Sequence, residues 1–140
     1  MRITRIEAAG FRGIRGSVTV PVTDGFLIVN GSNGSGKSTL FDAIEFALTG
    51  QISRPALASE NREDINSYIW WRGSVQASER EVRVVFNVTE GQTLTISRRP
   101  DGATFSVSGP DGEEQRFEEA ALRRFFAGES APQEGFLTRL

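Results

Sequence analysis

The sequence predicts an α/β fold in which an antiparallel β layer wraps around one strand and one helix joined by a glycine-rich loop. Two observations predict this fold. Several stretches alternate between apolar and polar residues, as half-buried strands do. Residues 33–50, NGSGKSTLFDAIEFALTG, pass from a glycine-rich loop into helical spacing. A chain of 140 residues can bury a real core, so residues 1–140 are expected to form a single lobe.

The first elements are expected to be strands. Residues 2–8 and 17–22 alternate and are separated by GFRGIRG, which predicts two antiparallel strands with a bent connection. The continuous apolar run at 26–29, FLIV, follows the turn pair Asp24-Gly25. Such a run is typical of a strand buried on both faces of a sheet.

The loop leads into a helix, and the next elements are strands. Apolar residues recur at helical spacing at Leu40, Ile44, Ala47 and Leu48, widened by Phe41 and Phe46, and Gly50 is the stop signal. This helix is expected to be mostly buried, and 51–66 is expected to be a loop. The stretches 80–88, 92–99 and 103–109 predict a three-stranded meander. Residues 113–126 predict an amphipathic helix.

The composition excludes several kinds of chemistry. The chain has no cysteine and no histidine, which removes disulfides, thiolate zinc sites and the commonest general base. No signal peptide opens the chain and no apolar run approaches about 20 residues, so we expect a cytoplasmic protein without a membrane segment. The net charge of -2 argues against coating nucleic acid by bulk charge, so any DNA contact is expected to be local.

One motif carries chemistry. Residues 31–38, GSNGSGKS, satisfy G-x-x-x-x-G-K-[ST] between an apolar run and a helix, the context in which this pattern binds phosphate. Lys37 is the only lysine among 16 basic residues, and its compact ammonium suits a phosphate cradle. The predicted phosphate site comprises Gly31, Ser32, Asn33, Gly34, Ser35, Gly36, Lys37, Ser38 and Thr39.

The roles within this motif follow from its chemistry. Lys37 is the candidate catalytic residue, which would bridge the β- and γ-phosphates, and the hydroxyl of Ser38 is the candidate Mg²⁺ ligand. Thr39 would reach the α-phosphate. A guanine-specific N-K-x-D segment needs a second lysine, so ATP is the expected nucleotide.

These residues resemble a known family. The N-terminal strand followed by Phe11-Arg12-Gly13, and then residues 26–50, look like the start of the head domain in SMC and SbcC-type ATPases, an ABC branch of the P-loop NTPases. The resemblance implies a composite ATP site completed by a C-terminal ATPase lobe and by a head-to-head dimer acting on DNA. It also implies that Arg12 lies near the nucleotide, and Arg54 loosely matches a position that senses ATP or DNA.

The groups that complete such a site are missing from the sequence. It contains no LSGG-like segment, no apolar run ending in Asp-Glu and no heptads, and Gln133 has no strand before it to form a Q-loop. We therefore expect a fragment or a naturally split half of a larger head. ATP hydrolysis is expected only when this lobe is combined with those motifs.

Two alternatives remain open. The lobe can belong to an overcoming-lysogenization or RecF-like ATPase coupled to a nuclease subunit, a distinction that depends on downstream sequence. Alternatively, the chain can be a stand-alone P-loop kinase or a nucleotide-sensing module. The DNA substrate, the pathway (repair, chromosome organisation or defence) and the oligomeric state also stay open.

Other conspicuous residues have simpler explanations. Trp70 and Trp71 point to opposite faces of a strand, so one of them is expected in the core. The pairs Arg98-Arg99 and Arg123-Arg124 lie near acidic residues, which predicts a solvated surface of mixed charge. The helix dipole is sufficient to explain Asp42 near the start of its helix.

Overall fold

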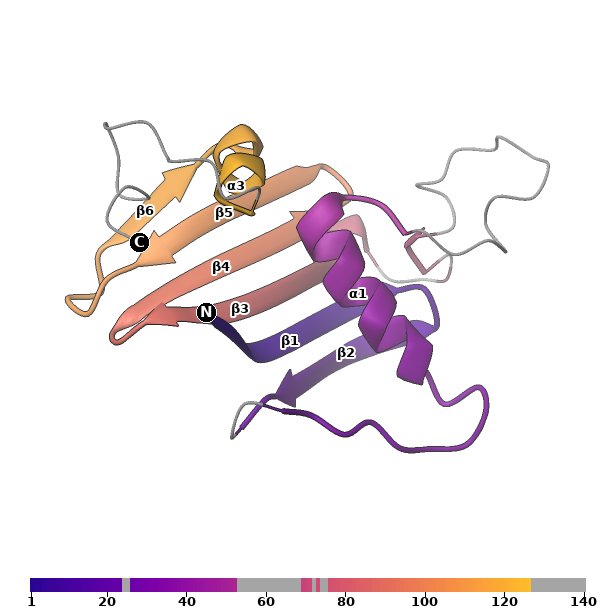
Figure 1. Cartoon of the computed structure of the whole chain (residues 1–140). Helices are drawn as coiled ribbons and strands as arrows, with labels where there is room; N and C mark the ends of the chain where they lie inside the picture. The colour runs from indigo at the N-terminus through magenta and orange to yellow at the C-terminus, as the bar shows by residue number, and fades with distance from the viewer. Residues whose placement is uncertain (24–25, 53–68, 72, 74–75, 127–140) are drawn as a thin grey trace.

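One six-stranded antiparallel sheet, with a helix lying across it, organises the chain (Figure 1). The computed structural model describes residues 1–23, 26–52, 69–71, 73 and 76–126. The order of the strands in the sheet is β2-β1-β3-β4-β5-β6. The predicted antiparallel layer is therefore confirmed, and this sheet with few helices fits an α/β ATPase lobe.

Strands β1 (Arg2–Phe11) and β2 (Ile14–Pro21) form an antiparallel hairpin, as predicted. The strands are longer than the alternation indicated, and only residues 12–13 form the turn between them. Arg12 takes a φ of 48°, a value that few residues other than glycine adopt. Its backbone N–H donates to the Ile69 carbonyl at 2.8 Å, which holds this turn in place.

The predicted meander is also confirmed. It consists of β3 (Glu81–Thr89), β4 (Gln92–Arg99) and β5 (Gly102–Ser108), preceded by a short 3-10 helix, η2 (Ala77–Glu79). Strand β3 pairs antiparallel with β1, which lies far away in the sequence, so Ile6 lies opposite Val84 and Ala8 lies opposite Val82. All four of these side chains are buried, and they join the hairpin and the meander into one sheet.

Helix α1 (Lys37–Thr49) covers one face of this sheet over β1, β3 and β4 (Figure 1). Phe46 of the helix packs against Phe11 of β1, with 5.6 Å between ring centroids, and against Trp70 at the same distance. Trp70 is buried and Trp71 is half-buried, so the prediction that one tryptophan lies in the core is confirmed. Gly50 ends the helix with a φ of 74°, as predicted.

The predicted helix over 113–126 is wrong in its first part. Residues Glu114–Phe117 form strand β6, which pairs with β5, and helix α3 covers only Glu119–Phe126. Phe105 lies opposite Phe117, and their rings lie 5.9 Å apart. The pairing with β5 and this ring contact both lie outside the stretch 113–126 whose helical spacing was read, so that spacing was misleading here.

The predicted buried strand at 26–29 is also wrong. Residues 26–30 have no regular secondary structure and pair with no strand among the described residues. Phe26 is 70% exposed and Ile28 is 80% exposed. A strand buried on both faces needs neighbours on both sides, and the described strands of this sheet do not supply them.

Helix α1 is less buried than expected because one apolar side chain faces outward beside this segment. Phe41 is 63% exposed, whereas Leu40 and Phe46 are buried. Together with Phe26 and Leu27, Phe41 lines an apolar groove of about 300 Å³. Some of the predicted features lie outside the described residues: the Asp24-Gly25 turn, residues 53–66 of the predicted loop with Arg54, and Gln133.

Candidate functional site

The loop between residue 31 and helix α1 has a backbone that demands glycine. Gly34 and Gly36 take φ values of 83° and 92°, in the left-handed range that side chains disfavour. A Cβ atom on Gly31 would lie 2.8 Å from the Ser35 hydroxyl oxygen, so that hydroxyl would have to rotate away. The spacing of glycines in the sequence motif therefore corresponds to real constraints on the folded loop.

Helix α1 begins directly after this loop without a cap. Gly36 occupies the N-cap position and supplies no side-chain hydrogen bond, and the first turn holds no acidic residue. The first N–H groups of a helix have no partner within the helix, and the helix dipole places partial positive charge there. The backbone N–H groups at the start of α1, which no side chain caps, are therefore arranged to bind an anion.

The single lysine lies at this helix start. Lys37 Nζ donates to the Gly31 carbonyl at 2.5 Å and to the Ser32 carbonyl at 2.6 Å. The ammonium therefore folds back over the loop, and its position is set by backbone atoms. Since both of these contacts are exposed, an incoming anion can approach the same ammonium from the solvent side.

A cavity of about 640 Å³ opens on this loop. The structure brings together most of the predicted site there and adds the turn and edge strand that follow β1. The lining residues are Gly13, Ile14, Arg15, Gly16, Val18, Asn33, Gly34, Ser35, Gly36, Lys37, Ser38 and Thr39. Gly31 and Ser32 lie behind the lining and contact Lys37 through their carbonyls.

Arg12, which the family resemblance places near the nucleotide, is not part of this lining. Its Nε lies 3.3 Å from Oδ2 of Asp42, a buried residue of α1. Arg12 Nη1 is buried and makes no hydrogen bond to any described residue. The ion pair ties the β1–β2 turn to α1, which gives Asp42 a role beyond the helix dipole.

Sequence reasoning missed the contribution of β2 to the cavity. Ile14, Arg15, Gly16 and Val18 line it although they lie about 20 residues before the motif. The alternation of β2 was visible in the sequence, but its position beside the loop depends on how the sheet packs on α1. Arg15 also lines the cavity, so this strand brings a positive charge to it.

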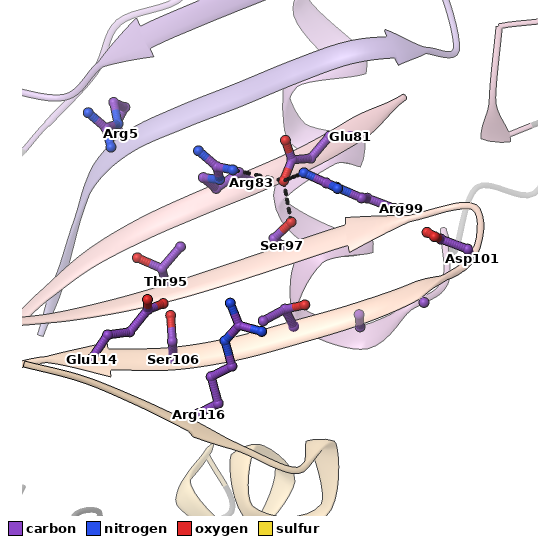
Figure 2. A pocket seen from close by; sticks show the side chains of 13 residues that line it. Arg5, Glu81, Arg83, Thr95, Ser97, Arg99, Asp101, Ser106, Glu114 and Arg116 are labelled. Carbon is purple, nitrogen blue, oxygen red and sulfur yellow. Dashed lines mark hydrogen bonds and ion pairs between the residues drawn. The ribbon is translucent and has the colours of Figure 1, made fainter. Parts of the chain in front are cut away.

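A second cavity, of about 630 Å³, lies on the sheet face away from α1 (Figure 2). Its lining mixes acidic and basic side chains, and Glu81 is paired with two of the arginines. Glu81 accepts hydrogen bonds from Ser97 at 2.5 Å, from Arg83 at 3.0 Å and from Arg99 at 3.4 Å. Burial raises the pKa of Glu81, but these donors outweigh it and leave the pKa lowered. This face is an ion-pair network rather than a one-sign basic patch.

The prediction of a solvated surface for both arginine pairs is wrong for Arg98. This residue is only 7% exposed, and its guanidinium bonds Glu119 of α3. The guanidinium carbon lies 5.4 Å from the centroid of the Phe105 ring. Strand alternation places residue 98 on the same face as the buried Leu94 and Ile96, a burial that charge alone did not reveal.

Among the described ranges, no helix is long and apolar enough to cross a membrane.

A family profile described as an AAA domain matches residues 5–125. The chain is 36% identical over 95 residues to the chromosome partition protein Smc of Synechocystis, covering 66% of this chain. It is 36% identical over 97 residues to Smc of Thermoplasma acidophilum, covering 69%. It is 34% identical over 109 residues to Smc of Pyrococcus furiosus, covering 71%.

The matches cover most of this chain but only a small part of each relative. The chain spans 8% of the length of the Synechocystis and Thermoplasma relatives and 9% of the Pyrococcus relative. On this chain, in contrast, the AAA domain profile reaches from β1 to α3. The resemblance inferred from the sequence is confirmed, and the chain belongs to the AAA domain family as an SMC-type N-terminal lobe.

Proposed function

We propose that this lobe binds MgATP through the loop at 31–36 and the start of α1. The observation that carries the proposal is the uncapped N-terminus of α1, preceded by Gly34 and Gly36 in left-handed conformations and followed by Lys37. Backbone N–H groups in such a loop point toward a common centre, where phosphate oxygens can accept hydrogen bonds. The cavity of about 640 Å³ beside the loop leaves room for a nucleotide.

The roles follow from the positions of the side chains. Lys37 would exchange its contacts with the Gly31 and Ser32 carbonyls for phosphate oxygens, at little cost because those contacts are exposed. Ser38 lines the cavity and would ligate Mg²⁺ together with phosphate oxygens. When bound, MgATP would supply the phosphoanhydride bond whose hydrolysis drives this class of ATPase.

We further propose that a C-terminal ATPase lobe completes the site and that two such heads dimerise around ATP. The exposed side chains of Phe26, Ile28 and Phe41 support a partner on this side of α1. The backbone of residues 26–30 also pairs with no described strand, so a strand of the partner could pair with it. Action on DNA is proposed from the chromosome-partition relatives, not from the charges of this chain.

Titration calorimetry with MgATP tests the binding proposal. We expect saturable binding by the wild-type chain and a loss of at least about tenfold in affinity for Lys37→Ala, which removes the single ammonium. Arg116→Ala, on the sheet face away from α1, is the matched control and should bind as the wild type does. Equal binding by the wild type and Lys37→Ala would refute the proposed site.

Hydrolysis and partner binding need separate measurements. The isolated chain should release phosphate from ATP no faster than Lys37→Ala does, and rapid magnesium-dependent release would contradict the need for a second lobe. In a pull-down with a C-terminal lobe encoded in the same genome, Phe26→Ser should reduce capture. Undiminished capture would exclude the 26–30 segment as the contact.

A further inference from the structure

Strand β4 carries a buried guanidinium that contacts both of the described α-helices. Arg98 Nε donates to the carbonyl of Ala47, in the last turn of α1, at 2.8 Å. Nη2 of the same side chain donates to Oε1 of Glu119, in the first turn of α3, at 3.0 Å. We call Ala47, Arg98 and Glu119 the helix link.

The α1 side of the helix link leads to the phosphate loop. Helix α1 runs from Lys37 to Thr49, so it is about 20 Å long, with the loop at its start and Ala47 in its last turn. A helix of this kind moves as one rigid element, and a cation beside its last carbonyls suits the negative end of its dipole. Arg98 therefore holds the end of the helix whose start is the proposed nucleotide site.

The α3 side of the helix link has few other anchors. Helix α3 has eight residues, and Leu122 is its one buried side chain among those the structure describes. A helix this short is not stable by itself in water, so its position depends on tertiary contacts. A segment with few buried apolar contacts opens at a lower cost in free energy than the core of a sheet does. The contact between Glu119 and Arg98 is therefore a large part of what docks α3.

The carboxylate of Glu119 has two competing donors. Its Oε1 lies 3.0 Å from Arg98 Nη2 and 3.1 Å from Arg123 Nη2. The contact with Arg98 ties α3 to β4 and α1, whereas Arg123 belongs to α3 itself, one turn farther along. When the helix link opens, the carboxylate thus keeps a partner on its own helix. Helix α3 has two states, one linked to α1 and one held by Arg123 alone.

We propose that the helix link couples the phosphate loop to α3, so that a nucleotide at the loop strengthens the docking of α3 and release of α3 weakens nucleotide binding. This proposal rests on the proposed nucleotide binding and adds a regulation to it. Lys37 must leave the Gly31 and Ser32 carbonyls to bind phosphate, so the start of α1 differs between the empty and the filled loop. Phosphate contacts restrict the motion of α1, and less conformational entropy is then lost when Arg98 and Glu119 are fixed at its other end. The coupling is reciprocal, because both events bias one equilibrium.

Three variants on α3 and the residue before it test the coupling without touching the loop. Glu119→Gln removes the charge that holds Arg98 and should open the helix link. Arg123→Gln removes the competing donor and should close the link further. Glu118→Gln is the matched control, because residue 118 is the exposed neighbour outside the link. Circular dichroism and urea unfolding verify that all three variants fold.

Hydrogen exchange of the full chain, followed by mass spectrometry with and without saturating MgATP, measures the effect of the nucleotide on α3. In the wild type we expect the amides of Glu119–Phe126 to exchange at least about threefold more slowly with MgATP. Glu119→Gln should abolish this protection and Glu118→Gln should retain it. Arg123→Gln should slow the exchange of α3 even without nucleotide.

Titration calorimetry measures the reverse effect, of α3 on the nucleotide. Glu119→Gln should weaken MgATP binding by at least about threefold, and Glu118→Gln should bind as the wild type does. Arg123→Gln should bind MgATP more tightly than the wild type. A purely structural role of the carboxylate would not give opposite signs for its removal and for the removal of its second donor.

The outcomes separate this proposal from the one on which it rests. If MgATP fails to bind the wild type, the proposed function fails and the coupling fails with it. If MgATP binds but neither slows exchange in α3 nor binds more weakly to Glu119→Gln, the nucleotide site stands and the coupling is refuted. Equal weakening by Glu118→Gln and Glu119→Gln would show a general effect of charge near α3, which also refutes the coupling.

Discussion

Arg98 Nη2 lies 3.0 Å from Glu119 Oε1, and Nε of the same guanidinium donates to the Ala47 carbonyl at 2.8 Å. Ala47 belongs to the last turn of α1 and Glu119 to the first turn of α3. A Cβ atom on Gly50 would lie 3.2 Å from this guanidinium, so the glycine after α1 also leaves room for it. One buried arginine of β4 therefore fixes an end of each helix on the sheet.

Replacing this arginine should destabilise the fold. Arg98→Met keeps most of the apolar stem but leaves the Ala47 carbonyl and the Glu119 carboxylate without their donor. We expect a decrease of about 2 kcal/mol in the free energy of unfolding, measured by urea denaturation. Arg99→Met is the control, since Arg99 is half-exposed on the opposite face and should cost less than about 1 kcal/mol. Equal losses would contradict the anchoring role of Arg98.

The same ion pair should contribute to acid sensitivity. The hydrogen bond from Arg98 lowers the pKa of Glu119, burial opposes it, and Arg123 lowers it further. The ionised carboxylate therefore stabilises the fold above its unfolded pKa of about 4.3, and this contribution is lost as the pH falls through the lowered pKa. Glu119→Gln should flatten the fall in thermal midpoint below about pH 5. Glu118→Gln, exposed on the preceding residue, should leave that curve unchanged.

The glycine before α1 is expected to be intolerant of a side chain. Gly36→Ala forces alanine into a φ of 92°. This should lower the free energy of unfolding by about 1–2 kcal/mol, or shift the loop backbone away from its present position beside Lys37. Urea unfolding measures the first effect and magnesium tripolyphosphate titration the second. Gly16→Ala, where φ is ordinary and space is free, should change neither by more than about 0.5 kcal/mol. An unaltered Gly36→Ala variant would show that the loop backbone is not constrained as described.

Arg12 and Asp42 provide a double-variant test. Arg12→Ala removes a partner of a buried carboxylate and should destabilise the fold by about 2 kcal/mol. Asp42→Asn removes the charge, so adding it to Arg12→Ala should recover at least about half of that loss. Urea unfolding of the two single variants and the double variant completes the cycle. A recovery in stability without a recovery in MgATP affinity would assign Arg12 a separate role at the nucleotide.

The sequence was sufficient for elements whose signals are local. The β1–β2 hairpin, the meander and helix α1 each show their own apolar periodicity and a turn or stop residue in the sequence. The structure contains all three. Residues 114–117 were misread because EQRF is short and highly charged, and only its pairing with β5 makes it a strand. The run at 26–29 was misread for the opposite reason: its apolar composition indicates burial, but the described strands offer it no neighbour.

For the site, the motif predicted which residues form the loop but not what stands opposite them. The conformations of Gly34 and Gly36 follow from the spacing of the pattern, whereas the contribution of β2 to the cavity depends on how the sheet packs against α1. Arg98 was misjudged because a charged residue at a strand position is usually solvated. Its burial is stabilised by partners in α1 and α3, about 50 and 20 residues away along the chain.

The position of Lys37 against the Gly31 and Ser32 carbonyls has a practical consequence for labelling chemistry. Among the 140 residues of this sequence Lys37 is the only lysine, so its Nζ is the only side-chain primary amine of this lobe. Acylation of this amine thus places a single lysine reporter in the lining of the cavity, and mass spectrometry can follow its protection without any engineered label.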